Sequence, residues 1–466
     1  MKTISVSVIV AFLGAVLFVG TVKTKTESQD HSELIAGPFE TPQDVTRACL
    51  ECHKESADEV MKTRHWNWLG EEFDIPGKGM GKLGKRNFIN NFCIAMPSNE
   101  PSCTSCHAGY GWKDNSFDFA NKDNVDCLVC HAAPGTYSKT PTAAGAPDKS
   151  VDLLKAARSV GKPHRTNCGI CHYNGGGGTN VKHGDLDPSL DNAARDLDVH
   201  MGGNKFECVD CHKTEKHKIM GAGHGSMAQG INHIACTDCH GNPDLHKNAL
   251  INKHIASVAC ETCHIPAFAK ELPTKMWWDW STAGKKADVK GPDGVETYSK
   301  IKGDFSWAKN VQPAYAWYNG KATYYSMGEK FDPSAVLRLN KLSGSISDPK
   351  ARIAPFKVMR GKQIFDSKNN YLIVPKLFGE GGFWKTFDWN LASEIGMKAV
   401  NLEYSGEYGF IETAMWWPIN HMVAPKAKAL PCKDCHNQGK RMDWKSLGYA
   451  SDPMKTGGRV KNGLVQ

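Results

Sequence analysis

Cysteine is the residue that most constrains what this chain can fold into. Of 17 cysteines, 16 fall into eight copies of one pattern, in which two cysteines separated by two residues are followed directly by histidine. Two thiols at this spacing reach the two vinyl groups of one haem, and the adjacent imidazole can bind its iron. The pattern therefore predicts eight covalently attached haem c groups. The copies are Cys49/Cys52/His53, Cys103/Cys106/His107, Cys127/Cys130/His131, Cys168/Cys171/His172, Cys208/Cys211/His212, Cys236/Cys239/His240, Cys260/Cys263/His264 and Cys432/Cys435/His436.

Other uses of paired cysteines do not account for this pattern. A zinc knuckle needs partnered cysteine pairs, but it does not require a histidine after every second cysteine. A redox dithiol enzyme needs one copy of the pair, and a disulfide scaffold needs no histidine at all. Eight complete copies leave haem attachment as the interpretation.

Residues 1–29 predict an export signal. Lys2 precedes an apolar run from Ile4 to Gly20, and a polar stretch rich in Thr, Lys and Ser follows. The run is somewhat short for a membrane span. Because no clean Ala-x-Ala cleavage site follows it, an uncleaved anchor stays open as the alternative. Haem is attached to this motif outside the bacterial cytoplasm, so we expect a periplasmic protein whose mature chain has no membrane span.

The formal charge of +8 does not indicate a nucleic-acid partner. Each ferric haem adds about one negative charge, because two propionates outweigh the single positive charge that remains on iron in the porphyrin. The protein with its haems is therefore near neutral. The excess of lysine and arginine serves mainly as counter-charge for the propionates.

The motifs divide the chain unevenly. Residues 30–264 carry seven of them and predict a haem-rich body, while residues 265–466 form an aromatic-rich covering region whose end carries the eighth. We expect a mainly α fold with much irregular loop, minor β structure and a core filled by porphyrins. Asp187 and Pro188 predict a helix that ends near His200, and a second helical pattern begins at Ile411 and is interrupted by Pro418.

Eleven histidines lie outside the motifs and are candidates for the second axial ligand of each iron. Position relative to a motif selects seven of them: His65, His200, His217, His233, His246, His254 and His421. The other four are left without an assigned haem: His31, His164, His183 and His224. A haem with two histidine ligands is closed to substrate and suited to electron transfer. A haem with a different ligand is where we expect chemistry.

Three residues outside these sets stand out. Lys182 follows a run of four glycines, Gly175 to Gly178, which lets the backbone approach a flat cofactor closely. A lysine binds iron only as the neutral amine, and an exposed lysine beside a flexible loop is the simpler interpretation. Cys93 is the one cysteine outside the motifs, with Asn90 one helical turn earlier. A buried thiol or a link between two copies of the chain are its alternatives.

With these residues the chain resembles the octahaem tetrathionate reductase family. The segments that carry the resemblance are Gly175 to Asp185 and Asn90 to Cys93, together with the eight motifs. The family is related in haem arrangement to hydroxylamine oxidoreductase and to pentahaem nitrite reductase. The resemblance implies that the second haem is catalytic, that Lys182 binds its iron, and that Asn90 and Cys93 stand in its pocket. It leaves the role of His107 open.

The resemblance implies a reductase that converts tetrathionate to thiosulfate, fed with electrons by a redox partner protein. Reduction of nitrite or hydroxylamine at the same haem is one alternative, and a non-enzymatic electron-transfer cytochrome is another. By analogy with nitrite reductase a calcium ion could lie near the active haem, although no calcium-loop pattern is legible.

Overall fold

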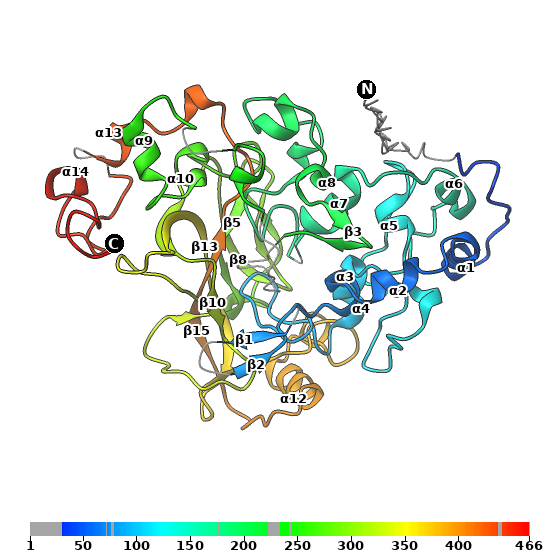
Figure 1. Cartoon of the computed structure of the whole chain (residues 1–466). Coiled ribbons are helices and arrows are strands. Elements are labelled where there is room, and N and C mark those ends of the chain that lie inside the picture. Colours follow the sequence, from blue (N-terminus) through cyan, green and yellow to red (C-terminus); the bar gives the residue numbers. More distant parts are fainter. Residues whose placement is uncertain are drawn as a thin grey trace, which may run out of the picture.

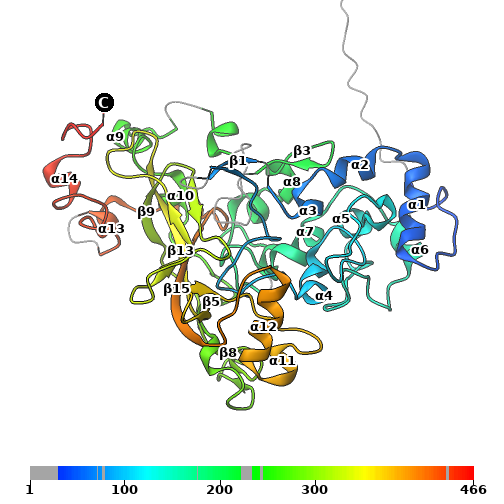
Figure 2. The same cartoon turned by 90° about the horizontal axis from the view of Figure 1, so that it is seen from below.

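The computed structural model describes residues 30–70, 72–75, 79–175, 177–221, 234–241, 245–436 and 440–465. Short helices and long loops make up most of the first part of the chain, whereas the part after His264 contains a large sheet (Figure 1). In both views α1 and α6 lie at one end of the molecule and α13 and α14 at the other, with the sheet between them (Figure 2). Among the described residues, no helix is long and apolar enough to cross a membrane.

Every haem motif lies on or beside a helical turn. Because residues three apart lie on the same side of a helix, this conformation turns both cysteines of a motif toward one haem. The helices are α1 (Pro42–Cys52), α2 (Ser56–Met61), α3 (Arg64–Asn67), α4 (Glu100–Cys103), α5 (Leu128–His131), α6 (Leu153–Arg158), α7 (Arg165–His172), α8 (Cys208–Cys211), α9 (Ala249–His254), α10 (Cys260–His264), α11 (Phe383–Thr386), α12 (Trp389–Ala399), α13 (Cys432–Cys435) and α14 (Pro453–Thr456). Tighter turns at η1 (Thr104–Cys106) and η5 (Cys236–Asp238) belong to the second and sixth motifs.

Helix α1 shows how the local sequence starts such a helix. Thr41 is the N-cap, and its side chain accepts a hydrogen bond from the backbone N–H of Asp44. The Asp44 side chain in turn accepts from the backbone N–H of Thr41, and Pro42 occupies the first helical position. This capping box satisfies donors that the helix itself leaves free, so the helix begins at a fixed residue before the first motif.

Nine strands between Thr274 and Pro418 form one sheet with the order β11-β15-β13-β5-β8-β7-β6, and β9 and β14 also pair with β13. The strands are β5 (Thr274–Asp279), β6 (Val289–Lys290), β7 (Glu296–Ser299), β8 (Gly303–Ala308), β9 (Ala314–Tyr318), β11 (Leu337–Arg338), β13 (Arg352–Asp366), β14 (Tyr371–Leu372) and β15 (Tyr408–Pro418). Short two-stranded pairs are β1 (Phe73–Ile75) with β2 (Gly79–Gly81), β3 (Thr214–Glu215) with β4 (Lys218–Ile219), and β10 (Ala322–Tyr324) with β12 (Asn340–Leu342). The largest apolar cluster packs on the nine-stranded sheet and includes Trp278, Met359 and Trp417.

The helix predicted from Ile411 is wrong, because this segment is strand β15. It pairs antiparallel with β13 from Phe356 opposite Pro418 to Asp366 opposite Tyr408. Aromatic and β-branched residues such as Phe410, Ile411 and Trp417 suit an extended strand, and the long partner strand decides the conformation.

The helix predicted from Asp187 to His200 is only partly present. Asp187 does cap a turn, Pro188–Leu190, but the turn ends there. The guanidinium of Arg165 donates to the carbonyl oxygen of Leu190 at 2.9 Å. A continuing helix would need that oxygen for the N–H of Ala194, so this side chain takes the place of a helical hydrogen bond.

Strand β5 buries a lysine among aromatic rings. Lys275 is 1% exposed, and its Nζ lies 3.9 Å from the ring centre of Trp278 and 3.2 Å from that of Phe305. Burial lowers the pKa of Lys275 from 10.5 to about 6, because the apolar surroundings disfavour the charged amine.

We expect Lys275→Met to stabilise the protein at neutral pH and to flatten its stability profile. Between pH of about 6 and about 10, Lys275 binds a proton in the unfolded chain but not in the folded one, so stability should fall as the pH falls through this window. Melting temperatures across this range test the expectation. The exposed Lys309 offers a matched control as Lys309→Met. Parallel profiles for Lys275→Met and the unmodified protein would contradict it.

Candidate haem centres

Seven of the eight motif histidines face a second histidine from elsewhere in the chain. The distance between ring centres varies little among the pairs. The pairs are His53 with His31 at 6.2 Å, His131 with His217 at 6.4 Å, His172 with His65 at 6.3 Å, His212 with His421 at 6.3 Å, His240 with His200 at 6.1 Å, His264 with His246 at 6.2 Å, and His436 with His254 at 6.2 Å.

This spacing fits an iron atom bound between two imidazoles. An iron–nitrogen bond of about 2 Å on each side, extended by about 1 Å from nitrogen to ring centre, places two ring centres about 6 Å apart. Direct stacking of two aromatic rings would not require so constant a distance at seven separate places. The donor set therefore fits haem iron at these seven positions.

The polypeptide covers the sixth motif less than the other motifs. Its cysteines, Cys236 and Cys239, are exposed, and so is His240. Cys239 lies just after the turn η5, where its backbone N–H donates to the carbonyl oxygen of Cys236 at 3.3 Å. The apolar clusters of the described residues include neither cysteine.

Exposed sulfur atoms also occur in three other motifs, at Cys52, Cys211 and Cys432. A free cysteine is usually buried like a small apolar residue, so these positions do not fit structural thiols. They fit thioether bonds to a large planar group that lies against the chain. Partial desolvation, and then the nearby Cys239, raise the pKa of Cys211, which places the fifth and sixth motifs close together.

Six of the seven histidines selected from the sequence lie opposite a motif histidine: His65, His200, His217, His246, His254 and His421. The seventh, His233, lies outside the described residues, as does His224. His31 takes a position that sequence reasoning did not assign, opposite His53. A count of partners could have found it. Because His65 faces the fourth motif, the first motif needs another histidine, and His31 lies before that motif in the sequence.

His107, in the second motif, is arranged differently from the other seven. Its Nε2 lies 2.7 Å from the backbone carbonyl oxygen of Trp66, which can only accept, so this nitrogen carries the proton and donates. Burial lowers the pKa of His107 to about 3, which keeps the ring neutral. In the described part of the chain no other histidine lies opposite it. It sits instead among the rings of Trp66, Trp68, Trp112, Phe117 and Phe119.

Lys182 lies close to this second motif. Its charge interacts with Lys85, Cys106 and Cys93, and its Nζ is 5.2 Å from the ring centre of Trp417. Burial, and then repulsion by Lys85, lower the pKa of Lys182 from 10.5 to about 8. The neutral amine, which is the form that binds a metal, is therefore more accessible here than on an ordinary lysine.

The glycine run allows this placement. A Cβ at Gly175 would lie 2.6 Å from Cβ of Lys182, and a Cβ at Gly177 would lie 2.6 Å from the carbonyl oxygen of Phe92. Both distances are shorter than carbon and oxygen atoms tolerate, so a side chain at either position would displace its neighbour. The glycines let the Lys182 segment and the Cys93 segment pack together.

Cys93 stands on a tight turn that Asn90 begins. Asn90 Oδ1 accepts hydrogen bonds from the backbone N–H groups of Phe92 at 3.0 Å and Cys93 at 2.8 Å. Gln363 of β13 donates to the Asn90 carbonyl oxygen at 2.8 Å and ties this turn to the sheet. The half-buried thiol therefore has a fixed position beside the second motif.

Three groups partly offset the effect of burial on the pKa of the Cys93 thiol. Burial raises its pKa, whereas the positive charge of Lys85, a hydrogen bond with Asn90 and the charge of Lys182 lower it. Lys85 was not predicted as a site residue, and its Nζ donates to the carbonyl oxygen of Cys103 at 3.3 Å. The sequence carried no motif that would have distinguished it from other lysines.

Hydrogen bonds between segments show which haem motifs are neighbours in space. Thr46 of α1 donates to the carbonyl oxygen of Val125 at 2.7 Å, which joins the first and third motifs. The Sγ of Cys171 lies 3.6 Å from the carbonyl oxygen of Cys106, so the fourth motif touches the second. Leu430 donates to the carbonyl oxygen of Cys263 at 3.0 Å and joins the eighth motif to the seventh.

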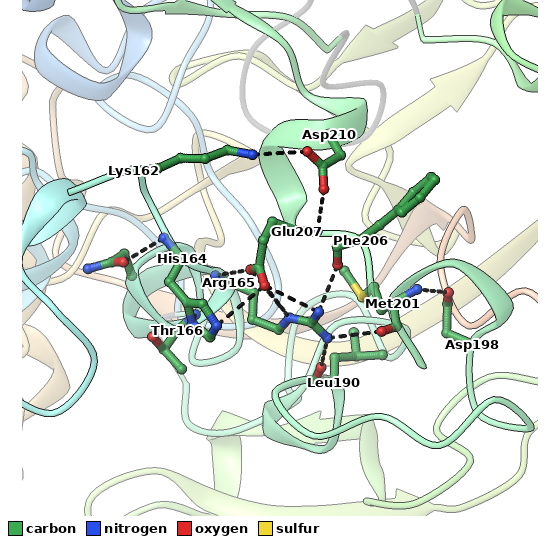
Figure 3. Close-up of polar contacts among 11 residues, drawn as sticks. Lys162, His164, Arg165, Thr166, Leu190, Asp198, Met201, Phe206, Glu207 and Asp210 are labelled. Atoms are coloured by element: carbon green, nitrogen blue, oxygen red, sulfur yellow. Dashed lines mark hydrogen bonds and ion pairs between the residues drawn. The ribbon is translucent and has the colours of Figure 1, made fainter. Parts of the chain in front are cut away.

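A buried arginine joins the fourth and fifth motifs (Figure 3). Arg165, at the start of α7, forms an ion pair with Glu207, the N-cap of α8, at 3.3 Å. The same guanidinium donates to the carbonyl oxygens of Phe206 at 2.8 Å and Leu190 at 2.9 Å. Because the five N–H donors of arginine have a fixed geometry, one side chain sets the relative position of both motif helices. His164, for which no iron was assigned, also faces Glu207, at 3.3 Å.

Three histidines of the facing pairs have carboxylate partners on the ring nitrogen Nδ1. His217 lies 2.8 Å from Glu59, His421 lies 3.2 Å from Asp185, and His436 lies 2.6 Å from Asp452. A carboxylate at this nitrogen fixes the ring orientation and makes the other nitrogen a stronger ligand.

Comparisons with known proteins agree with this geometry. The structure matches the crystal structure of octaheme cytochrome c from Shewanella oneidensis with a TM-score of 0.86 and 52% sequence identity, over 92% of this chain and 98% of that one. The chain belongs to the octahaem c-type cytochromes. The resemblance stated from the sequence is thus confirmed at the level of this family, and so is the predicted fold class.

Two further comparisons support covalently bound haem c in this octahaem cytochrome. Sequence profiles described as "Cytochrome c554 and c-prime" and "Cytochrome c bacterial" match residues 48–132 and 275–439. An uncharacterized protein from Archaeoglobus fulgidus is 26% identical over 239 residues, which are 41% of this chain and 80% of that protein.

We expect Gly175→Ala to destabilise the protein by about 1–3 kcal/mol, because the added methyl group overlaps the stem of Lys182. Gly161→Ala is the matched control, since a Cβ there has no neighbour within 4 Å, and its effect should stay within about 0.5 kcal/mol. Chemical denaturation of both variants measures the difference. Equal stabilities would show that the close approach at Gly175 is not required.

Proposed function

We propose that this octahaem cytochrome is a reductase in which seven haems transfer electrons and the haem of the second motif reduces the substrate. One observation carries the proposal: seven motif histidines face a second histidine at 6.1–6.4 Å, whereas His107 donates its Nε2 proton to Trp66 instead. The second motif thus has cysteines for haem attachment but, among the described residues, no histidine pair for its iron. With one haem at each motif, the proposed protein carries eight haem c groups.

Lys182 supplies the missing ligand in this proposal. It approaches the second motif from the segment after the fourth, its pKa is lowered to about 8, and its neighbours include Cys106. With Lys182 as its ligand in place of a second histidine, this iron would be able to bind a small substrate. His31 joins the six histidines named above as second ligand of the remaining irons, in place of the predicted His233.

Tetrathionate is the substrate that best explains Cys93. The thiolate attacks one central sulfur atom of tetrathionate, which releases one thiosulfate and leaves a thiosulfate group joined to Cys93 through a sulfur–sulfur bond. Two electrons from the haems then cleave this bond, which releases the second thiosulfate and restores the thiolate. Burial raises the pKa of Cys93 overall, and the charge of Lys85 and the hydrogen bond with Asn90 partly offset this in favour of the thiolate. The charge of Lys85 also suits a substrate with two negative charges.

The order of the motifs gives electrons a route to this site. The fourth motif touches the second through Cys171 and Cys106 and is joined to the fifth by Arg165 and Glu207. Electrons from a donor protein reach the second haem through the fourth in this arrangement. The exposed sixth motif, with Cys239 beside the fifth, suits the place where such a donor docks.

Two further parts of the proposal come from the sequence alone. Export to the periplasm is predicted from residues 1–29, which lie outside the described residues. A calcium ion near the active haem comes from the analogy with pentahaem nitrite reductase.

Reduction of nitrite or hydroxylamine is a second candidate activity. It needs an open coordination position on the iron but no thiol, and the arrangement of Lys182 supports it as well. A non-enzymatic electron carrier is the remaining alternative, and it requires every iron to have two strong ligands.

We expect Cys93→Ala and Cys93→Ser to lower tetrathionate turnover by at least about 100-fold and to retain nitrite reduction. Lys182→Met should abolish both activities. Steady-state assays with a reduced viologen dye as electron donor measure these effects. Full tetrathionate turnover in both cysteine variants would remove the covalent step.

Electron paramagnetic resonance of the oxidised protein separates an enzyme from an electron carrier. The proposal predicts one high-spin iron beside the low-spin irons, and a change in its signal when nitrite is added. Spectra that show only low-spin iron and no response to nitrite would contradict a catalytic haem.

A further inference from the structure

A second lysine, Lys357, lies directly behind Lys182. It belongs to β13, its side chain is fully buried, and its Nζ donates to the carbonyl oxygens of Val181 at 2.6 Å and Lys182 at 3.2 Å. The third donor goes to the hydroxyl of Thr274, on the neighbouring strand β5, at 2.6 Å. An ammonium group has three donors, and all three have acceptors here.

Thr274 extends this contact by one residue. Its hydroxyl accepts from Lys357 and donates to the carbonyl oxygen of Asn180 at 2.5 Å. The carbonyl oxygens of residues 180, 181 and 182 are therefore all held by two side chains of the sheet. Asn180 has a positive φ of 55°, and its side chain donates to the carbonyl oxygen of Leu272 at 3.1 Å, which fixes the start of the segment.

The sheet is a rigid support for this contact. Strand β13 pairs with β15 along most of its length, with Lys357 opposite Trp417, and with β5 from Arg360 to Lys362, so the base of the lysine side chain cannot shift without breaking ladder hydrogen bonds. The segment it holds is otherwise a loop that follows four glycines. Without the two side chains, three carbonyl groups at the centre of the molecule would lose their donors.

We propose that Lys357 and Thr274 are positioning residues that hold the backbone of residues 180–182 and so keep the Lys182 amine at the haem of the second motif. The proposal rests on the proposed function, in which Lys182 binds that iron. Neither side chain touches the substrate. They act by fixing the backbone that carries the Lys182 side chain. A shift of about 1 Å at a catalytic group can lower a rate by about 100-fold.

Lys357→Met tests this proposal, because methionine keeps an unbranched side chain only one atom shorter and removes all three donors. The purified protein with its haems is studied by electron paramagnetic resonance in the oxidised state, with and without nitrite. We expect the signal of the second-motif iron to change toward that of Lys182→Met, while the low-spin signals of the other irons are retained. Turnover should fall by about 100-fold.

Lys275→Met is the matched control. Lys275 is an equally buried lysine in β5, next to Thr274, but its Nζ packs on aromatic rings, and none of its described contacts reaches residues 180–182. Its removal should leave the signal of the second-motif iron unchanged. Thr274→Val is a second, milder variant for the case that Lys357→Met does not fold, and it should produce the same spectral change in part.

The outcomes separate this proposal from the one on which it rests. If Lys182→Met alters the spectrum but Lys357→Met and Thr274→Val, both folded, do not, the two residues are merely structural and the proposal is overturned. If Lys182→Met itself leaves the spectrum unchanged, the assignment of Lys182 as iron ligand fails. A change in Lys275→Met equal to that in Lys357→Met would also contradict a specific positioning role.

Discussion

The pairing of two imidazole rings about 6 Å apart is the interaction on which this structure depends. Each pair joins a motif to a histidine in another segment of the chain. The pairs therefore link segments that short helices and loops alone would not hold together. Apart from α1 and α7, the α-helices that carry the motifs have only four or five residues, and none of these helices is long enough to be stable alone. Their positions follow from the iron ligands, from Arg165 between α7 and α8, and from short backbone contacts between motifs.

The sheet has a different task, which is to hold the two segments that face the second motif. Strand β13 is the common support: Lys357 holds residues 180–182, the carbonyl oxygen of Met359 accepts from Asn91, and Gln363 donates to Asn90. Lys357 and Gln363 are an even number of residues apart, so their side chains lie on one face of the strand, and the contact with Asn91 uses the backbone of Met359 between them. The strand thereby sets the relative position of Lys182 and Cys93, which are far apart in sequence. The covering region is thus part of the site.

Chemistry that depends on local spacing could be predicted from the sequence, and geometry that depends on distant partners could not. His31 was missed because its choice depends on His65 facing the fourth motif. The helix expected from Ile411 is absent because β13 decides the conformation of that segment, and the helix after Asp187 stops because Arg165 donates to the carbonyl oxygen of Leu190. The roles of His107, Lys85, Lys357 and Thr274 were beyond any argument from spacing, since they arise where buried polar groups must find partners in the folded chain. The exposure of Cys239 could not be predicted either, because its motif has the same spacing as the motifs whose cysteines are partly covered.

The pairing of His212 with His421 has a consequence for biogenesis. His421 lies far downstream of the fifth motif, so a nascent chain that has reached this motif does not yet contain the histidine that faces His212. The two rings can be brought together only after β15, which ends just before His421, has been made and can pair with β13.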